Sequence, residues 1–407
     1  MKARLTSYRS TLSALVAGVL LVWAPGFVFA QARPAPMYVG ADPTPRALRF
    51  GPLELYPRAV VEEIYDDNIF LEAVDEEIDF ITHYRPNIHG RLTFKDHIVE
   101  FGAMGDIADF SSNEKENYTN QAYDAGLFLN FARLSLELKG YFADTTAPSS
   151  SATLSELGPR IRHWDSESVG VLGIKLGKKA KIEFDARFYD LEYDASGLGR
   201  LERTEIGGGA SFFWRIRPKT DIFVGYEYTQ LDFDSITAAD PQDDSESHLA
   251  LGGLRFEPGP KLVGRVSAGA ELRDYDSIDD HTTPAFATDL TWFTTPKLTL
   301  TVFVSREFED SSSSAGDQFI RATKVGGSVR YNLTDRLMVR FEGEYDNDNY
   351  DTSREGDTGR GVGEISYFII RDILRLSAKY ERIDHDSTIE DKDYDVNRAS
   401  AEVLIQY

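Results

Sequence analysis

Apolar and polar side chains alternate one by one along much of this chain, most clearly in the segment 298–308. Leu298 and Val302 fall on one face of an extended chain there, whereas Thr299 and Thr301 fall on the other. A period of two residues predicts a β-strand with one face in an apolar environment and the other in a polar one. The same alternation returns twice after a tight turn, in 337–350 and 373–384. The repeating unit is therefore a β-hairpin.

The length of these strands favours a membrane barrel over a soluble sandwich. The run 298–308 has about ten residues, which at roughly 3.3 Å per residue and a tilt of roughly 45° covers the apolar band of about 25 Å of an outer-membrane barrel. Strands of soluble sandwiches are usually nearer five or six residues. Aromatic side chains stand at both ends of the apolar runs, as two interfacial girdles require: Trp292, Tyr331 and Tyr367 near the tight turns, and Phe308, Tyr345 and Tyr380 at the far ends.

Alternation and turn signals predict about 18 strands from Leu53 onward. Their ranges are 53–70, 77–93, 97–111, 121–131, 133–146, 163–176, 180–193, 203–216, 221–234, 245–257, 262–275, 284–294, 298–310, 318–332, 337–350, 359–370, 373–384 and 394–407. Short turns such as Lys95-Asp96 alternate with longer acidic loops such as 385–393, which is the asymmetry between the periplasmic and outer ends of a barrel. We therefore predict an all-β fold, a transmembrane antiparallel up-and-down β-barrel over 51–407 with no plug domain.

The start of the chain predicts export from the cytoplasm. Residues 1–30 have a basic beginning, an apolar run over 12–23 and a small-residue cleavage site that ends at Ala30. This is the pattern of a signal peptide cleaved after Ala30. Residues 31–50 are rich in proline, so we expect an extended periplasmic lead-in. Together with the barrel pattern, this places the mature protein in the bacterial outer membrane.

Charge and cysteine content narrow the range of partners. The net charge is −23, and removal of Lys2, Arg4 and Arg9 with the signal peptide gives −23 − 3 = −26. Such a charge argues against nucleic acid as a partner. We expect contact with outer-membrane lipid and lipopolysaccharide instead. The chain has no cysteine, which removes disulfides, thiolate metal sites and cysteine nucleophiles.

The last strand carries an expected assembly signal. It alternates up to an aromatic final residue, Tyr407, and this ending resembles the signal that the barrel assembly machinery of the outer membrane reads. That machinery is thus an expected partner.

We find no sequence motif of an enzyme, a nucleotide site or a metal centre. The seven histidines are scattered. A lipase-like site at the outer girdle that used His163 or His385 is a weak alternative to solvated histidines. The acidic clusters around Asp348 and Asp391 match no calcium-loop spacing, so they are expected to be solvated loops. We predict no catalytic residues, cofactor or metal.

Charged residues of both signs recur on the predicted inward faces of several strands. In a hydrated pore they would set selectivity; in a closed lumen, paired charges would brace neighbouring strands. A barrel of about 18 strands leaves more lumen than side chains alone fill, which favours the pore. The candidate pore-lining residues are Glu183, Asp185, Arg187, Glu227, Arg340, Glu342, Glu344, Arg375, Lys379 and Glu381.

Three stretches carry a family resemblance. They are the sequence YDDNIF over 65–70, Asp79-Phe80-Ile81 followed by Pro86, and LTWFTTPKLTLTVFVSREF over 290–308. The chain resembles the bacterial family of putative β-barrel porin 2, and the likeness covers nearly the whole mature sequence. The resemblance implies a link to exopolysaccharide export, because members of that family often accompany export genes.

The leading expectation is therefore a barrel through which an extracellular polysaccharide is exported, with a periplasmic polysaccharide export protein as partner. A diffusion porin for small solutes is the first alternative, and constriction loops folded inward would favour it. Long tracks of aromatic side chains would favour the polymer. A structural or adhesive barrel with a closed lumen is the second alternative, favoured if the inward charges pair completely.

Overall fold

A computed structural model describes residues 46–407 apart from 148–159, 195–197, 235–242, 258–260, 277, 311–318, 352–353 and 389–391. The expectations for the signal peptide, for cleavage after Ala30 and for most of the lead-in 31–50 lie outside the described residues. Among the described residues, no helix is long and apolar enough to cross a membrane.

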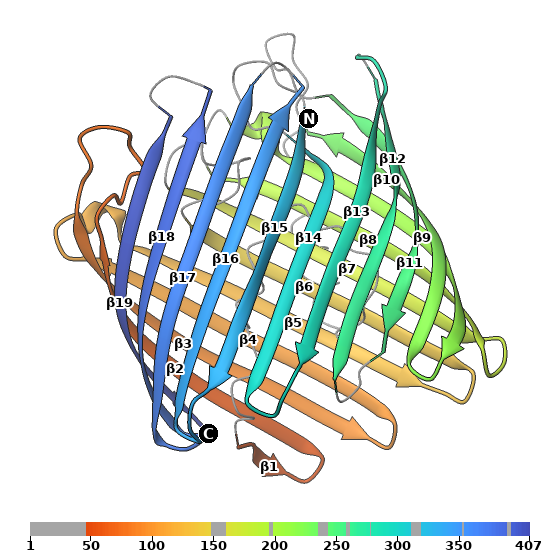
Figure 1. The fold of residues 1–407 in the computed structure, drawn as a ribbon, viewed down its shortest axis with the longest axis horizontal. Coiled ribbons are helices and arrows are strands. Elements are labelled where there is room, and N and C mark those ends of the chain that lie inside the picture. The colour runs from red at the N-terminus through yellow and green to blue at the C-terminus, as the bar shows by residue number, and fades with distance from the viewer. Residues whose placement is uncertain are drawn as a thin grey trace, which may run out of the picture.

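The chain forms a single antiparallel sheet that closes on itself as a barrel (Figure 1). Each strand from β2 to β19 pairs with the next, and β19 pairs with β2 to close the ring, for example Val403 with Val61. The strands are β1 (Leu48–Phe50), β2 (Leu53–Asp66), β3 (Asp79–Phe94), β4 (His97–Phe110), β5 (Tyr118–Asn130), β6 (Leu134–Ala147), β7 (Ile161–Lys175), β8 (Ala180–Tyr193), β9 (Arg203–Arg217), β10 (Thr220–Phe233), β11 (Ser245–Phe256), β12 (Leu262–Tyr275), β13 (His281–Phe293), β14 (Leu298–Asp310), β15 (Phe319–Asn332), β16 (Leu337–Tyr350), β17 (Glu355–Ile370), β18 (Leu374–Ser387) and β19 (Tyr394–Gln406).

The prediction of an antiparallel barrel of about 18 strands is confirmed, because β2 to β19 make up the ring. The additional strand β1 lies within the predicted lead-in and pairs with the first residues of β2. The first barrel strand ends at Asp66 rather than at Phe70. Residues 67–70 therefore begin a loop, and this difference matters for closure of the barrel.

The two ends of the barrel differ in their connections (Figure 1). At one end, called the turn end, the strands are joined by short turns, such as the two residues between β3 and β4. Lys95 and Lys219 take positive φ angles of 55° and 64° in such turns. The connections at the other end, called the loop end, include 67–78 and the short 3₁₀ turns Glu114–Glu116 and Gly199–Leu201. This asymmetry assigns the turn end to the periplasm.

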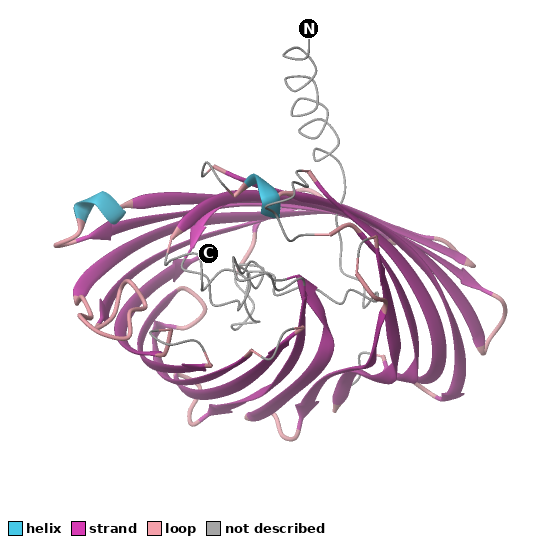
Figure 2. Ribbon diagram, turned by 90° about the horizontal axis from the view of Figure 1, so that it is seen from above, coloured by secondary structure: helices cyan, strands magenta, loops and turns pink. Residues whose placement is uncertain are grey.

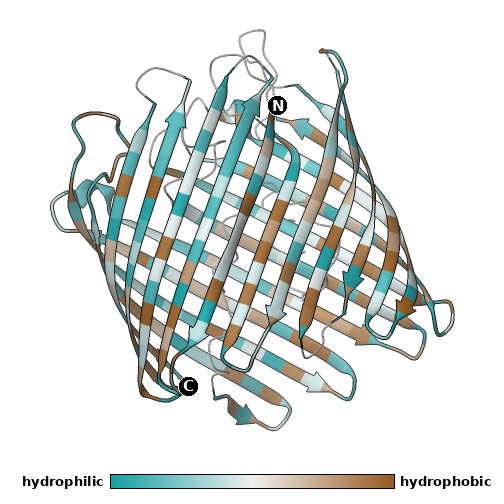
Figure 3. Ribbon diagram, viewed as in Figure 1, coloured by the Kyte–Doolittle hydropathy of each residue, from teal (hydrophilic) through white to brown (hydrophobic). Residues whose placement is uncertain are grey.

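Apolar and polar residues alternate along the strands (Figure 3), and large apolar side chains such as Val224 and Phe341 are exposed on the outer face of the barrel. The predicted girdle residues Trp292, Tyr345 and Tyr380 are about half exposed on this face. Phe308 is the exception, because only 5% of it is exposed. Its prediction as an outer girdle residue was wrong: the strand that carries it turns inward near its end, as described below.

The loop after β2 fastens the first strand to the last. Arg398 of β19 donates to Asp66 (Nε to Oδ2, 2.7 Å), and the Asn397 amide groups donate to both oxygens of Asp67. Asn68 is fully buried and donates to the carbonyl oxygen of Asp395 at 3.1 Å. The YDDNIF sequence thus supplies the polar contacts that close the loop end of the barrel seam.

Candidate functional site

The largest described hollow lies inside the barrel and has a volume of about 2150 Å³. Figure 2 looks along the barrel and shows the strands surrounding this interior. Its lining residues come from the part of each strand nearer the turn end, for example Val60 and Glu62 of β2, Thr301 of β14 and Glu342 of β16. The hollow is therefore a vestibule on the periplasmic side, and we call it the inner vestibule.

The lining of the inner vestibule is dense in charge and nearly balanced. Its basic residues are Arg58, Arg85, Lys181, Lys219, Arg255, Arg330, Arg340, Arg360, Arg375 and Lys379, and its acidic residues are Glu62, Asp106, Glu137, Glu183, Glu257, Asp289, Glu342, Glu364 and Glu402. That is 10 − 9 = +1 in a chain of net charge −23. The excess of acid is therefore carried by other parts of the protein.

All ten candidate pore-lining residues project from the inner face, because they share the alternation phase of vestibule residues or contact them. Five line the inner vestibule: Glu183, Arg340, Glu342, Arg375 and Lys379. The other five lie nearer the loop end or within ion pairs: Asp185, Arg187, Glu227, Glu344 and Glu381. Their role in selecting a solute stays a prediction.

Most of these charges pair along the wall. Arg360 of β17 contacts Glu342 of β16 at 2.8 Å and Glu381 of β18 at 2.6 Å. Arg187 of β8 likewise joins Glu167 of β7 and Glu205 of β9, at 2.8 Å and 2.7 Å. Pairs between adjacent strands brace the sheet, and they leave the vestibule between opposite walls open.

One arginine reaches beyond its neighbouring strand. Arg255 of β11 lies 3.7 Å from the centre of the Phe213 ring and donates to Asp221 of β10 at 2.9 Å and to Glu183 of β8 at 3.3 Å. A planar guanidinium can stack on a ring while its edge binds carboxylates. These contacts tie β8, β10 and β11 together along one side of the vestibule.

Sequence reasoning missed the inward charges of the first strands. Arg85 of β3 pairs with Glu62 of β2 and with Asp106 of β4, and His83 also contacts Asp106 at 2.8 Å. The alternation along each strand does place these residues on the inner face. That face is harder to assign from the sequence where Pro57 and Pro86 interrupt the apolar face.

The sheet departs from a regular barrel wall near the loop end, between β13 and β14. The cause is a bend in the hairpin β14–β15: pairing of β13 with β14 stops at Phe286 and Arg306, although both strands continue toward the loop end. Beyond that point, the Phe308 amide lies 3.4 Å from Oε2 of Glu271, which points inward from β12. Because β13 separates β12 from β14 in the sheet, β14 can reach Glu271 only across the inner face of β13. We call residues 307–309 and 319–324 the inward hairpin.

Aromatic packing holds the inward hairpin in place. Phe319 is fully buried, and its ring lies 5.1 Å from that of Phe308, 5.5 Å from Tyr275 and 4.7 Å from His281. Edge and stacked contacts at these distances add to the stability gained from burial. The hairpin therefore has a defined position inside the barrel.

Among the described residues, the aromatic side chains of the lumen form no track along the passage. Phe256 and Phe293 are the aromatic side chains among the described residues that line the inner vestibule. Inward aromatics nearer the loop end, such as Tyr193, Phe233 and Tyr350, are each less than 9% exposed. They pack against the wall and the loops, so they offer no ring face to a passing sugar chain.

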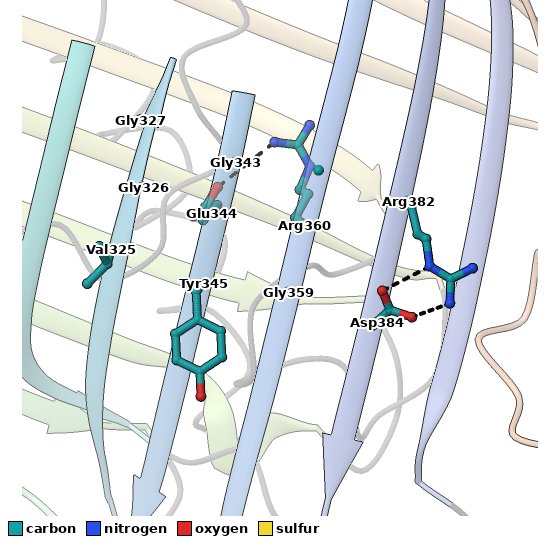
Figure 4. A pocket seen from close by; sticks show the side chains of 11 residues that line it. Val325, Gly326, Gly327, Gly343, Glu344, Tyr345, Gly359, Arg360, Arg382 and Asp384 are labelled. Atoms are coloured by element: carbon teal, nitrogen blue, oxygen red, sulfur yellow. Dashed lines mark hydrogen bonds and ion pairs between the residues drawn. The ribbon is translucent and has the colours of Figure 1, made fainter. Parts of the chain in front are cut away.

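A second, smaller hollow of about 530 Å³ lies on the outer wall over β15 to β18 (Figure 4). Gly327, Gly343 and Gly361 stand opposite one another in register and leave it without side chains. An ion pair between Arg382 and Asp384 lies at one side. Most of its lining residues belong to the outer face, and Arg360 lines both hollows.

The described residues contain no group of three histidines, aspartates or glutamates spaced to hold a metal ion.

Comparison with known families decides the membership of the chain. The family model of putative beta-barrel porin 2 matches residues 42–407. The chain belongs to this family. It is an outer-membrane protein, in agreement with the resemblance of the YDDNIF stretch and the hairpin at 290–308. No curated protein matches the sequence.

Solved porin structures are similar to this chain over most of its length, at low identity. The outer membrane protein OpdK of Pseudomonas aeruginosa is 10% identical with a TM-score of 0.44, and the match covers 87% of this chain and 99% of OpdK. OccAB4 of Acinetobacter baumannii is 11% identical with a TM-score of 0.45, covering 87% and 98%. A BenF-like porin of Pseudomonas fluorescens Pf-5 is 10% identical with a TM-score of 0.47, covering 87% and 99%. Likeness of this degree identifies no solute.

The description of the matched family names no cargo, so export of a polysaccharide stays a prediction. The aromatic track that would favour a polymer is missing among the described lumen residues.

Proposed function

We propose that this barrel is a porin through which small polar solutes diffuse across the outer membrane. The observation that carries the proposal is the inner vestibule: about 2150 Å³, lined by charges of both signs and by two aromatic rings. A solute inside such a lining stays surrounded by water and polar groups, and no part of it is bound strongly. A passage for diffusion needs this combination, because tight binding would slow release.

The two other candidate functions fit this lumen less well. Export of a polysaccharide needs repeated sites along the passage, and stacking on aromatic rings is the usual contact with sugar rings. A closed structural barrel would leave no open hollow between its walls, even with its inward charges paired between neighbouring strands. Here, pairs such as Arg360 with Glu342 run along the wall and leave the vestibule open.

A permeability assay tests the proposal. The purified protein is reconstituted into liposomes, and the swelling rate is measured in isosmotic solutions of uncharged sugars of increasing size. We expect swelling that falls steeply with solute size. Empty liposomes and liposomes that hold heat-denatured protein are the controls. An absence of swelling with the smallest sugar would refute the proposal.

Planar-bilayer recording adds a direct test against the polymer. We expect conductance steps that an acidic polysaccharide, added to either side, leaves unchanged. Block of the steps by the polymer from the turn end would favour export instead.

A further inference from the structure

One wall of the inner vestibule carries an excess of cations. The four consecutive strands β15 to β18 contribute five basic and two acidic residues to the lining, which is 5 − 2 = +3. The rest of the lining holds five basic and seven acidic residues, which is 5 − 7 = −2. The two acidic residues of β15 to β18 are Glu342 and Glu364. The five basic residues, which we call the basic wall, are Arg330, Arg340, Arg360, Arg375 and Lys379.

The cations of the basic wall are more accessible from the hollow than most carboxylates of the remaining lining. The side chains of Arg340, Arg360 and Lys379 are 32%, 29% and 36% exposed. Four of the seven acidic side chains elsewhere in the lining are only 9% to 12% exposed, namely Glu62, Asp106, Glu137 and Glu183. A solute inside the vestibule therefore meets the cations of β15 to β18 directly.

Carboxylates behind the lining do not cancel this charge. Arg360 contacts Glu381 at 2.6 Å and Glu344 at 3.9 Å, and neither acid lines the vestibule. With both acids counted, the wall of β15 to β18 keeps a net charge of 3 − 2 = +1.

Two arginines of the basic wall stand directly opposite each other. Arg330 of β15 pairs with Arg340 of β16 in the register of the sheet, and both side chains line the vestibule. Like charges in this arrangement repel each other. An anion that contacts both side chains lowers that repulsion, so the pair favours negative groups in the hollow.

We propose that the basic wall attracts solutes that carry an oxyanion, a carboxylate or a phosphate group, and that Arg330 and Arg340 hold this group as the solute passes. The proposal rests on the proposed diffusion function and names its solute class. A guanidinium presents its N–H donors in a rigid fork that matches the oxygen atoms of both groups. The arginines stay in contact with water inside the hollow, so the attraction is weak enough to allow release.

Reversal potentials in gradients of potassium chloride, acetate and phosphate measure this attraction as the ratio of anion to K⁺ permeability. A unit charge about 4 Å from an ion in water changes the local ion concentration by about fivefold. The double variant R330Q/R340Q should therefore lower the anion to K⁺ ratio by about fivefold at low salt. Glu364 stands opposite Arg340 in the register of β16 and β17, so E364Q should raise the ratio instead.

The three anions test the recognition of the oxyanion. In R330Q/R340Q the fall should be larger for acetate and phosphate than for chloride, because two oxygen atoms of either group can accept hydrogen bonds from both side chains. The larger of these two falls identifies the group that the arginines hold. An equal fall for all three anions would contradict the holding role of Arg330 and Arg340.

Arg382→Gln is the matched control, because Arg382 lies on the outer face of β18 in an ion pair with Asp384. Its permeability ratio should equal that of the native protein. The variant R330K/R340K keeps both charges and loses the planar forks, so it should keep the chloride ratio and lose the additional preference for acetate and phosphate. Slower migration of heated than of unheated protein in a denaturing gel shows that each variant is folded.

The outcomes separate this inference from the function on which it rests. Conductance with an unchanged ratio in folded R330Q/R340Q, or an equal change in R382Q, overturns the role of the basic wall and leaves the diffusion porin intact. An absence of both conductance and sugar-driven swelling in the native protein refutes the porin and the basic wall together. A ratio that falls in R330Q/R340Q and rises in E364Q supports the basic wall, since a purely structural defect would not reverse the sign of the change.

Discussion

The seam of the barrel gives the sharpest test of the structure, through the substitution Asn68→Ala. The Asn68 side chain is fully buried and makes three hydrogen bonds with the backbone. Nδ2 donates to the carbonyl oxygens of Glu72 at 2.8 Å and Asp395 at 3.1 Å, and Oδ1 accepts from the amide of Glu72 at 3.0 Å. One of the three bonds crosses from the first loop to the last strand.

The magnitude follows from these bonds. Each hydrogen bond contributes about 1 kcal/mol net, so the loss of three lowers the unfolding free energy by about 3 kcal/mol. The loss is not smaller than this, because the substitution leaves buried backbone groups without a partner. A loss of about 3 kcal/mol lowers the folding equilibrium constant about a hundredfold. The same loop holds Leu71 at a φ of 57°, a conformation that costs about 1–2 kcal/mol in a residue other than glycine. Asn68 must offset that cost as well.

Urea unfolding in lipid vesicles, followed by tryptophan fluorescence and by gel mobility without heating, measures the change. Asn332→Ala is the matched control, because Asn332 lies on the inner wall and its side chain makes no hydrogen bond among the described residues. We expect the control to change the unfolding free energy by less than about 0.5 kcal/mol. If Asn68→Ala and Asn332→Ala gave the same unfolding free energy, the seam contacts would not hold the barrel closed.

Three further predictions address packing, membrane position and processing. Gly269→Ala should lower the unfolding free energy by about 1–3 kcal/mol, because an added Cβ would lie 1.8 Å from the Ala250 carbonyl oxygen, whereas Gly343→Ala meets nothing within 4 Å and should be neutral; equal stability of the two variants in urea titrations would contradict this. In variants that retain either Trp214 or Trp292 alone, brominated lipids should quench tryptophan fluorescence most when the bromine lies near the headgroups. The reason is that both residues are exposed on the outer face near the turn end. Strongest quenching at the bilayer centre would contradict a position of these residues in the aromatic girdle. Mass spectrometry of the protein from outer membranes should show an N-terminus at residue 31, and a mature chain that keeps residues before Ala30 would contradict the predicted cleavage.

The outer faces of the strands could be predicted from the sequence with good accuracy. Alternation alone set the strand count, the hairpin order and the lipid-facing side, since a one-residue shift would put every apolar side chain of a strand into water. The register of Gly327, Gly343 and Gly361 follows from that constraint and from the short turns. Strand ends were less certain: the first strand stops at Asp66, and beyond it Asn68 bonds to Asp395 of β19 while Ile69 packs against residues of β3 and β4.

The inner face was only partly predictable. Residues such as Glu342 and Arg375 could be assigned to the lumen from alternation, because the inner face of a hydrated barrel accepts polar side chains. Their partners could not be assigned, since Arg255 contacts Glu183 across two intervening strands. A sequence pattern carries no information on which inward side chains meet across a curved wall.

The sequence by itself determined that this chain is an outer-membrane barrel, because the requirement to satisfy every backbone polar group in lipid leaves a closed sheet as the solution for alternating strands. The tertiary structure alone decided how the lumen is filled. The alternation that predicts a regular strand over 298–310 continues past the point where β14 separates from β13. It therefore gives no sign that Phe308 turns inward toward Glu271. That bend depends on the packing of Phe319 against Tyr275 and His281. Such contacts join strands that are distant in the sequence, and they place the inward hairpin against the inner face of β12 and β13.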